Sequence, residues 1–377
     1  MTPTELLSKR MMPTQDRPPL TTSRPGLSTR TTGPRLRELD GLRLLAALMV
    51  CLYHYTGRDG PVADAWGGSP RDVFPHLTQI GQYGSLGVQI FFVISGFVIC
   101  MSSWGRGVGD LFRSRVVRLY PAYWAALFLT AGAAVLVGLD SVPRYGDFLI
   151  NLTMLQMPTG TPRVLGVCWT LWAELRFYLL FAAFVLWKGA TKRRVTLFCG
   201  GWTVAAVIAQ GAQNDILNTL VVPEGAPYFV IGLALYLIHR FGNDPALWGV
   251  VAVNWALGSG FAMQNVPAPS TSAREPLIIL AVLTCGIGAM ALIATGRLAF
   301  ARWRWLTVAG ALTYPFYLIH EHVGWSAILL LRQHLGLPAA WTLPTAVAVM
   351  LGTAWLIHRF VERPLTSYLR AQLRRRR

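Results

Sequence analysis

The sequence is poor in charged residues for its length. Only 14% of its 377 residues are Asp, Glu, Lys or Arg, whereas soluble globular domains carry roughly 25%. Hydrophobic residues make up 53% of the chain, and the mean hydropathy is +0.44. This balance excludes an ordinary soluble domain and indicates a protein that crosses a membrane several times.

Motifs of several common enzyme classes are absent. The five cysteines are odd in number and include no Cys-x-x-Cys pair, so the sequence predicts neither a disulfide framework nor a zinc site. It also contains no Gly-x-Ser-x-Gly motif, no phosphate-binding P-loop and no internal repeat. We therefore expect no bound metal, and the candidate chemistry rests on other residues.

Ten apolar stretches approach the twenty residues that a helix needs to cross a bilayer. We therefore predict an all-α fold, a polytopic transmembrane helix bundle of about ten spans. Glycine and polar residues dilute the fifth and seventh stretches. The predicted spans are 39–56, 84–103, 119–138, 166–187, 195–210, 222–239, 246–263, 276–295, 307–331 and 341–360.

The distribution of basic residues predicts the orientation of the bundle. The net charge is +17, which in a soluble protein would suggest nucleic acid. With the N-terminus inside, 26 of the 34 Lys and Arg residues lie in cytoplasmic segments and six in outer loops. Basic residues are enriched on the cytoplasmic side of membrane proteins, so we expect both termini in the cytoplasm.

Composition divides the chain into three parts. Residues 1–38 are rich in Pro, Thr, Ser and Arg and have no apolar periodicity, so we expect a disordered, basic cytoplasmic tail. Residues 39–365 hold the predicted membrane domain, and 366–377 form a basic cytoplasmic C-terminal tail. Either tail could bind anionic lipid or simply be solvated.

A few ionisable residues interrupt the apolar segments. Arg43 and His54 are eleven residues apart in the first segment, which places them on one helix face. At about 1.5 Å per residue, His54, His320 and Glu174 fall about 18–22 Å above the cytoplasmic boundary. Arg43, Arg115 and Arg118 fall near that boundary instead. Charged groups inside a membrane are costly, so this arrangement predicts a reaction centre above an anion-binding mouth.

Six short motifs accompany these residues and together cover the chain from residue 39 to about 365. They are Leu39-Asp-Gly-Leu-Arg43 followed by His54, Gly87-Val-Gln-Ile-Phe-Phe-Val-Ile-Ser-Gly-Phe97, Arg115-Val-Val-Arg118-Leu-Tyr-Pro121, Trp169-Thr-Leu-Trp-Ala-Glu174-Leu-Arg-Phe-Tyr178, Tyr317-Leu-Ile-His320 and Phe360-Val-Glu-Arg-Pro364. As a set they resemble the signature stretches of the acyltransferase-3 family of integral-membrane O-acyltransferases. Leu175 and Arg176 depart from the Glu-Glu-Gln stretch of that family, which leaves the role of Arg176 open.

The resemblance implies an acyl-CoA-dependent acyltransferase, with acyl-CoA as co-substrate and residues 39–365 as the acyltransferase domain. The acyl group, acetyl by default as the smallest common donor, would pass to a hydroxyl of a glycan, glycolipid or glycosylated natural product. The resemblance also implies a bacterial plasma-membrane protein. No nucleic-acid partner is expected, and the sequence does not specify the oligomeric state.

The residue types suit this chemistry. A sugar hydroxyl is a poor nucleophile and needs a general base that works near neutral pH. Histidine is a suitable residue type, so His54 is the candidate base, and Glu174 could orient its imidazole. His320 is a second candidate for the base or for holding the acceptor hydroxyl. The phosphates and pantetheine arm of acyl-CoA could be bound by Arg43, Arg115 and Arg118. The catalytic candidates are therefore His54, Glu174 and His320, and the donor-binding candidates are the three arginines.

Each assignment has a structural alternative. Arg115 and Arg118 could be interfacial anchors, and Glu174 could form a structural ion pair with Arg176 or His54. His320 and His322 could be histidines satisfied within the bundle. The alternative function is a proton-coupled transporter or flippase that uses the same His and Glu groups, although no inverted repeat supports it. A glycan-export accessory without chemistry is a third interpretation.

Overall fold

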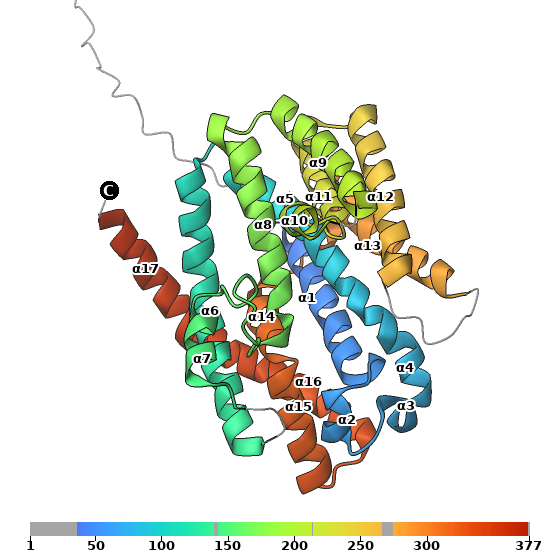
Figure 1. Ribbon diagram of the computed structural model, residues 1–377, viewed down its shortest axis with the longest axis vertical. Helices are drawn as coiled ribbons and strands as arrows, with labels where there is room; N and C mark the ends of the chain where they lie inside the picture. The colour runs from blue at the N-terminus through green and yellow to red at the C-terminus, as the bar shows by residue number, and fades with distance from the viewer. Residues whose placement is uncertain (1–35, 139–141, 213, 266–273, 376–377) are drawn as a thin grey trace, which may run out of the picture. The chain divides into compact units, whose positions relative to one another are not determined.

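The computed structural model describes residues 36–138, 142–212, 214–265 and 274–375 (Figure 1). These residues form helices and connecting turns without any strand, as the predicted all-α fold requires. The first helix, α1 (Arg37–Leu52), begins two residues before the predicted start of the membrane domain. The predicted N-terminal tail lies outside the described residues up to residue 35.

Eight helical segments of the described chain are long and apolar enough to cross a bilayer. All eight coincide with predicted spans. Their helices are α5 (Gly87–Ser103), α6 (Val108–Val137), α8 (Trp169–Phe184), α9 (Lys192–Ala212), α11 (Ala226–Phe241), α12 (Pro245–Asn265), α13 (Glu275–Ala294) and α16 (Ala339–Ile357).

The other two predicted spans are also helical, but each is irregular. The first consists of α1 and a π-helical turn, η1 (Tyr53–Gly57). The ninth, expected as one helix over 307–331, is divided into α14 (Leu306–Ile319) and α15 (His322–Leu329), so that expectation was wrong. The side chain of His320 explains the break, since its Nδ1 lies 2.8 Å from the Tyr317 carbonyl oxygen that a continuous helix would offer to the Glu321 N–H.

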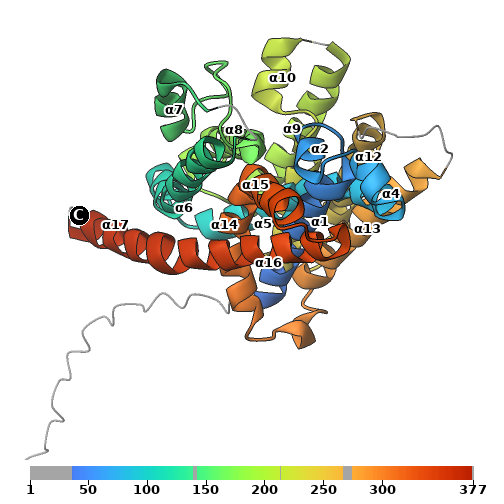
Figure 2. The same cartoon turned by 90° about the horizontal axis from the view of Figure 1, so that it is seen from below.

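Shorter helices complete the described chain. They are α2 (Pro61–Trp66), α3 (Pro70–Val73), α4 (Pro75–Gly81), α7 (Tyr145–Leu152), α10 (Asp215–Val221) and α17 (Arg363–Arg375). The π-helical segment η7 (His358–Glu362) joins α16 to α17, and Figure 2 shows these two helices almost in line along one side of the bundle. The predicted C-terminal tail is thus helical through Arg375.

The centre of the bundle is formed by α1, α5, α11 and α14. Helix α1 packs on both α14 and α5, and α5 packs on α11. Gly96 of α5 and Gly232 of α11 face one another so closely that a Cβ at either position would overlap the backbone of the other helix. Small residues allow this close approach in membrane helix pairs.

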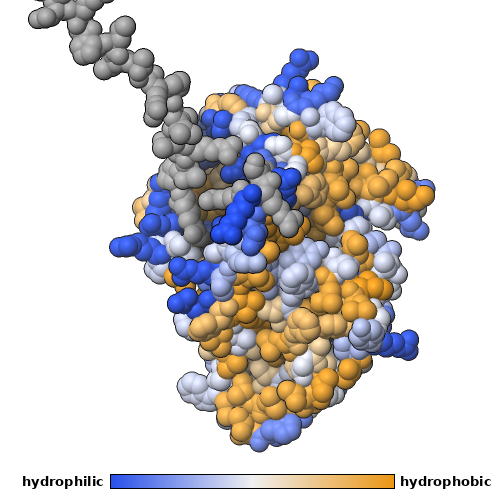
Figure 3. All heavy atoms as spheres, turned by 90° about the vertical axis from the view of Figure 1, so that its left-hand side faces the viewer, coloured by the Kyte–Doolittle hydropathy of each residue, from blue (hydrophilic) through white to orange (hydrophobic). Residues whose placement is uncertain are grey.

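The outer surface matches a membrane environment. Large apolar side chains are exposed on the outer helices, among them Phe128, Leu136 and Phe184. Figure 3 shows hydrophobic residues over much of one face, with hydrophilic residues gathered mainly toward one end. Four of the five cysteines are buried, and Cys285 is exposed. The bundle therefore presents an apolar surface to its surroundings and encloses the ionisable residues described next.

Candidate active site

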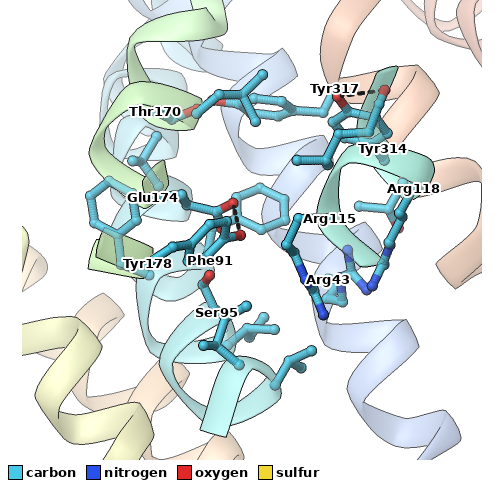
Figure 4. A pocket seen from close by; sticks show the side chains of 18 residues that line it. Arg43, Phe91, Ser95, Arg115, Arg118, Thr170, Glu174, Tyr178, Tyr314 and Tyr317 are labelled. Carbon is cyan, nitrogen blue, oxygen red and sulfur yellow. Dashed lines mark hydrogen bonds between the residues drawn. The ribbon is translucent and has the colours of Figure 1, made fainter. Parts of the chain in front are cut away.

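The three arginines singled out in the sequence line one pocket. Arg43 comes from α1, and Arg115 and Arg118 lie one helical turn apart on α6. Glu174 and Tyr178 of α8 face them, and Figure 4 shows Thr170 and Tyr317 toward another end of the same space. We call this space, about 90 Å³ in volume, the arginine pocket.

The arginine pocket has an excess of positive charge. Arg115 donates a hydrogen bond to Ser102 Oγ at 3.0 Å, but its buried Nε has no acceptor among the described residues. Arg43 and Arg118 make no hydrogen bond or close ion pair in the part of the chain that the structure describes. The lining includes one carboxylate, Glu174, which accepts a hydrogen bond from Tyr178 Oη at 2.7 Å. Three guanidinium groups against one carboxylate make a site suited to a polyanion.

A second space lies beside the first and contains His54. Its volume is about 350 Å³, and we call it the histidine cavity. Tyr53, Arg58, Gln89, Trp169, Glu224 and Tyr228 are among the other residues that line it. Aromatic side chains together with carboxylate, amide and guanidinium groups are suited to a hydroxyl-bearing ligand with both apolar and polar faces. Val88 and Tyr317 are the described residues common to the linings of both spaces.

The π-helical turn fixes the backbone around His54. Two tryptophans satisfy carbonyl groups of this turn: the Trp325 indole N–H donates to the His54 carbonyl at 3.0 Å, and that of Trp66 to the Tyr55 carbonyl at 2.8 Å. Such turns are frequent at functional sites because they redirect side chains within a helix. The His54 side chain is thereby held at the wall of the histidine cavity.

Glu321 lies against His54. One carboxylate oxygen is 3.5 Å from His54 Nδ1 and 3.8 Å from the Arg58 guanidinium, and the other is 3.9 Å from His322 Nε2. Glu321 occupies the two-residue break between α14 and α15, and its side chain is buried. Gly166 makes room for it, since a Cβ at that position would overlap the carboxylate. No hydrogen bond joins the two side chains, since the buried His54 Nδ1 has no hydrogen-bond partner among the described residues, so Glu321 acts on the imidazole as a nearby charge.

His320 stacks on His54 but does not line either cavity. The two ring centroids are 5.1 Å apart with an angle of 29° between the planes. A carbonyl oxygen can only accept, so the Nδ1 bound to Tyr317 carries a proton and the neutral ring keeps a lone pair on Nε2. That Nε2 is buried without a hydrogen-bond partner among the described residues. Of the two histidines, His54 lines the histidine cavity, and His320 lines neither of the two spaces.

The structure places the predicted residues in two groups. His54 and His320 lie together, as their matching depths indicated, and the three arginines share one pocket. Glu174 lies with the arginines and not beside His54, and Glu321 is the carboxylate that lies 3.5 Å from His54 Nδ1. The sequence signal for Glu321 was its place directly after His320 within an apolar segment.

Arg176, whose role the sequence left open, points away from Glu174. Its guanidinium donates to the Thr219 carbonyl oxygen at 2.8 Å and lies 5.6 Å from the centroid of the Trp172 ring. These contacts connect α8 to α10. The alternative of an ion pair between Glu174 and Arg176 is therefore not what the structure shows.

Three curated proteins are similar to this chain in sequence. Acyltransferase MdmB of Streptomyces mycarofaciens is 27% identical over 374 residues, covering 89% of this chain and 92% of its own. The exopolysaccharide production protein ExoZ of Rhizobium meliloti (strain 1021) is 29% identical, covering 77% and 92%. The putative peptidoglycan O-acetyltransferase YrhL of Bacillus subtilis (strain 168) is 26% identical, covering 87% of this chain and 54% of its own.

No solved structure matches the chain. The family model described as an acyltransferase domain matches residues 36–359, which include the residues that line both cavities. The chain therefore belongs to the acyltransferase-3 family.

Proposed function

We propose that this protein is an integral-membrane O-acyltransferase that transfers an acyl group, acetyl by default, from acyl-CoA to a hydroxyl of a carbohydrate or glycosylated acceptor. The observation that carries the proposal is the contact between two unlike spaces, a cationic pocket and a cavity with a histidine and carboxylate pair, across Val88 and Tyr317. The names of two relatives, which concern exopolysaccharide and peptidoglycan, support a carbohydrate acceptor.

The arginine pocket would bind the donor. Acyl-CoA carries phosphates, and guanidinium groups bind phosphate oxygens through paired, charge-assisted hydrogen bonds. Arg43 and Arg118 are not committed to any hydrogen bond among the described residues, so both have their donors available. Glu174, held by Tyr178, would balance part of the charge and orient the arginines. The thioester would then lie toward Tyr317, at the boundary with the histidine cavity.

His54 would act as the general base in the histidine cavity. It would take the proton from the acceptor hydroxyl, whose oxygen attacks the thioester carbonyl carbon. The new C–O bond forms and the C–S bond breaks, and the protonated imidazole returns its proton to the CoA thiolate. Glu321, 3.5 Å from His54 Nδ1, would stabilise the imidazolium and leave Nε2 for the acceptor. His320 would position the His54 ring by stacking on it.

We further propose ten spans with both termini in the cytoplasm, in the plasma membrane of a bacterium. Eight helices meet the length and apolarity expected for a span, and α1 with η1 and α14 with α15 would supply the other two. The excess of basic residues in the predicted cytoplasmic segments supports this orientation. It would open the arginine pocket toward the cytoplasm, where acyl-CoA is available.

A test of the function uses the purified protein in detergent with acetyl-CoA and a panel of carbohydrate acceptors. We expect release of free CoA thiol that depends on the acceptor, and an acylated product by mass spectrometry. His54→Ala should abolish both signals, whereas His76→Ala, an exposed histidine on α4, should retain them. Transport of a glycan or lipid into vesicles without any ester formation would instead favour a transporter.

A further inference from the structure

Tyr317 stands between the two spaces and is held from several sides. Its side chain is buried, with 7% exposed, and it lines both the arginine pocket and the histidine cavity. Phe91 contacts its ring edge-on with centroids 5.3 Å apart, and His320 lies 5.5 Å away and binds its carbonyl oxygen. A side chain fixed in this way forms part of the wall between the two spaces, and the thioester carbonyl would meet the acceptor hydroxyl beside it.

A hydrogen-bond chain extends this wall. Thr170 Oγ1 lies 2.9 Å from the Val167 carbonyl oxygen and 3.1 Å from Tyr317 Oη. A carbonyl oxygen only accepts, so the single hydroxyl proton of Thr170 goes to Val167, and the Tyr317 hydroxyl must donate to Thr170. Thr170 lines the arginine pocket and Val167 lines the histidine cavity. The chain therefore connects α14 to the start of α8 across the boundary.

The space on the donor side of Tyr317 is small. The arginine pocket, about 90 Å³ in volume, must also receive part of the phosphate-bearing arm of the donor, so little of it is left for the acyl chain. An acetyl group adds one carbon beyond the thioester carbonyl and can stay beside Tyr317. An octanoyl group adds seven carbons and has to pass the Tyr317 ring to extend further.

We propose that Tyr317 is a specificity-determining residue that limits the transferred acyl group to short chains. The inference rests on the proposed function and deepens it by naming the donor class, short-chain acyl-CoA. The phenol ring blocks extension of the acyl chain from the arginine pocket into the histidine cavity, and the hydrogen bond to Thr170 keeps the ring in that position. Val88, the other lining residue common to both described spaces, contributes a smaller part of the same wall.

The test measures kcat/KM for acetyl-CoA and octanoyl-CoA with one acceptor, and compares the octanoyl-to-acetyl ratio among variants. Wild type should favour acetyl-CoA at least about tenfold. Tyr317→Ala should raise the octanoyl-to-acetyl ratio at least tenfold, and Tyr317→Phe and Thr170→Val, which remove the hydrogen bond from either side, should raise it severalfold. A wild type that uses both donors equally well would overturn the proposal.

A milder pair of variants keeps the test decisive if Tyr317→Ala does not fold. Val88→Ala removes two methyl groups from the shared wall, and Val93→Ala makes the same change on α5 at a buried position that lines neither space. We expect Val88→Ala to raise the octanoyl-to-acetyl ratio threefold or more and Val93→Ala to leave it unchanged. Equal ratios in Val88→Ala, Val93→Ala and wild type would refute the assignment of chain-length selection to the shared wall. Absence of acyl transfer from both donors in wild type would instead refute the proposed function.

Discussion

The arginine pocket and the histidine cavity are built from different kinds of backbone. The ionisable residues of the arginine pocket lie within regular helices, on α1, α6 and α8. The histidine site lies at two irregularities, the π-helical turn that carries His54 and the break that carries His320 and Glu321. In this protein the proposed donor-binding charges lie on regular helices, whereas the proposed base and its neighbouring carboxylate lie where the backbone departs from regular helical spacing.

The variant His54→Ala should separate catalysis in the histidine cavity from donor binding in the arginine pocket most strongly. Loss of the general base should reduce the transfer rate about a thousandfold, within the usual range for such catalysis. Binding of CoA should be unchanged, because His54 does not line the arginine pocket. Steady-state thiol release and isothermal titration with CoA measure the two quantities. A parallel loss of CoA binding would show that the spaces are not functionally separate.

The double variant Arg115→Ala/Arg118→Ala should weaken donor binding and leave the transfer rate nearly unchanged. Each lost charge-assisted hydrogen bond costs about 1.5 kcal/mol at the low end, so the KM for acetyl-CoA should rise about a hundredfold. The kcat at saturating donor should change little. Arg113→Ala is the matched control, because this arginine is on the same helix but is exposed. A fall in kcat with an unchanged donor KM would contradict the assignment.

The variant Glu321→Gln tests whether Glu321 is the carboxylate that assists His54. The amide keeps the shape but removes the negative charge that stabilises the imidazolium, a loss of about 2 kcal/mol or thirtyfold in kcat. The donor KM should stay the same. Asp244→Asn breaks the 2.7 Å ion pair with Lys192 and lines neither cavity, so it serves as a control for removing a paired carboxylate. If Glu174→Gln lowered kcat more than Glu321→Gln, the orienting role would return to Glu174.

Gly166→Ala should produce the smallest effect. The added Cβ overlaps the Glu321 carboxylate and must displace it, a cost of about 1 kcal/mol and a fivefold fall in kcat. Gly288→Ala introduces the same methyl group into α13 with no atom within 4 Å, so its activity should match wild type. Equal activity of the two variants would show that the position of Glu321 does not matter for transfer.

The contrast between regular helices and irregular backbone also explains which features the sequence predicted. Runs of apolar residues located every helix that meets the criteria for a span, and helical spacing placed Arg115 and Arg118 on one face. Depth along ideal helices also brought His54 and His320 to one level. The same arithmetic put Glu174 near them, because it measures height and not the direction in which a side chain points.

Glu321 could not be assigned from regular periodicity. It follows His320 directly, and adjacent residues on a continuous helix point in directions about 100° apart. Only the break after α14 turns the carboxylate toward His54, and this break arises from a side-chain contact of His320 with the Tyr317 carbonyl. Sequence patterns describe regular elements well, whereas such a local competition for a carbonyl becomes visible only in three dimensions.

The narrow boundary between the two spaces has a kinetic consequence. Since Val88 and Tyr317 are the described lining residues that the spaces share, filling one space leaves the lining of the other almost intact. Donor and acceptor can then be bound at the same time, and neither product has to leave before the second substrate arrives. Initial-velocity plots should therefore intersect, as for a ternary complex. A CoA analogue that fills the arginine pocket should compete with the donor but not with the acceptor.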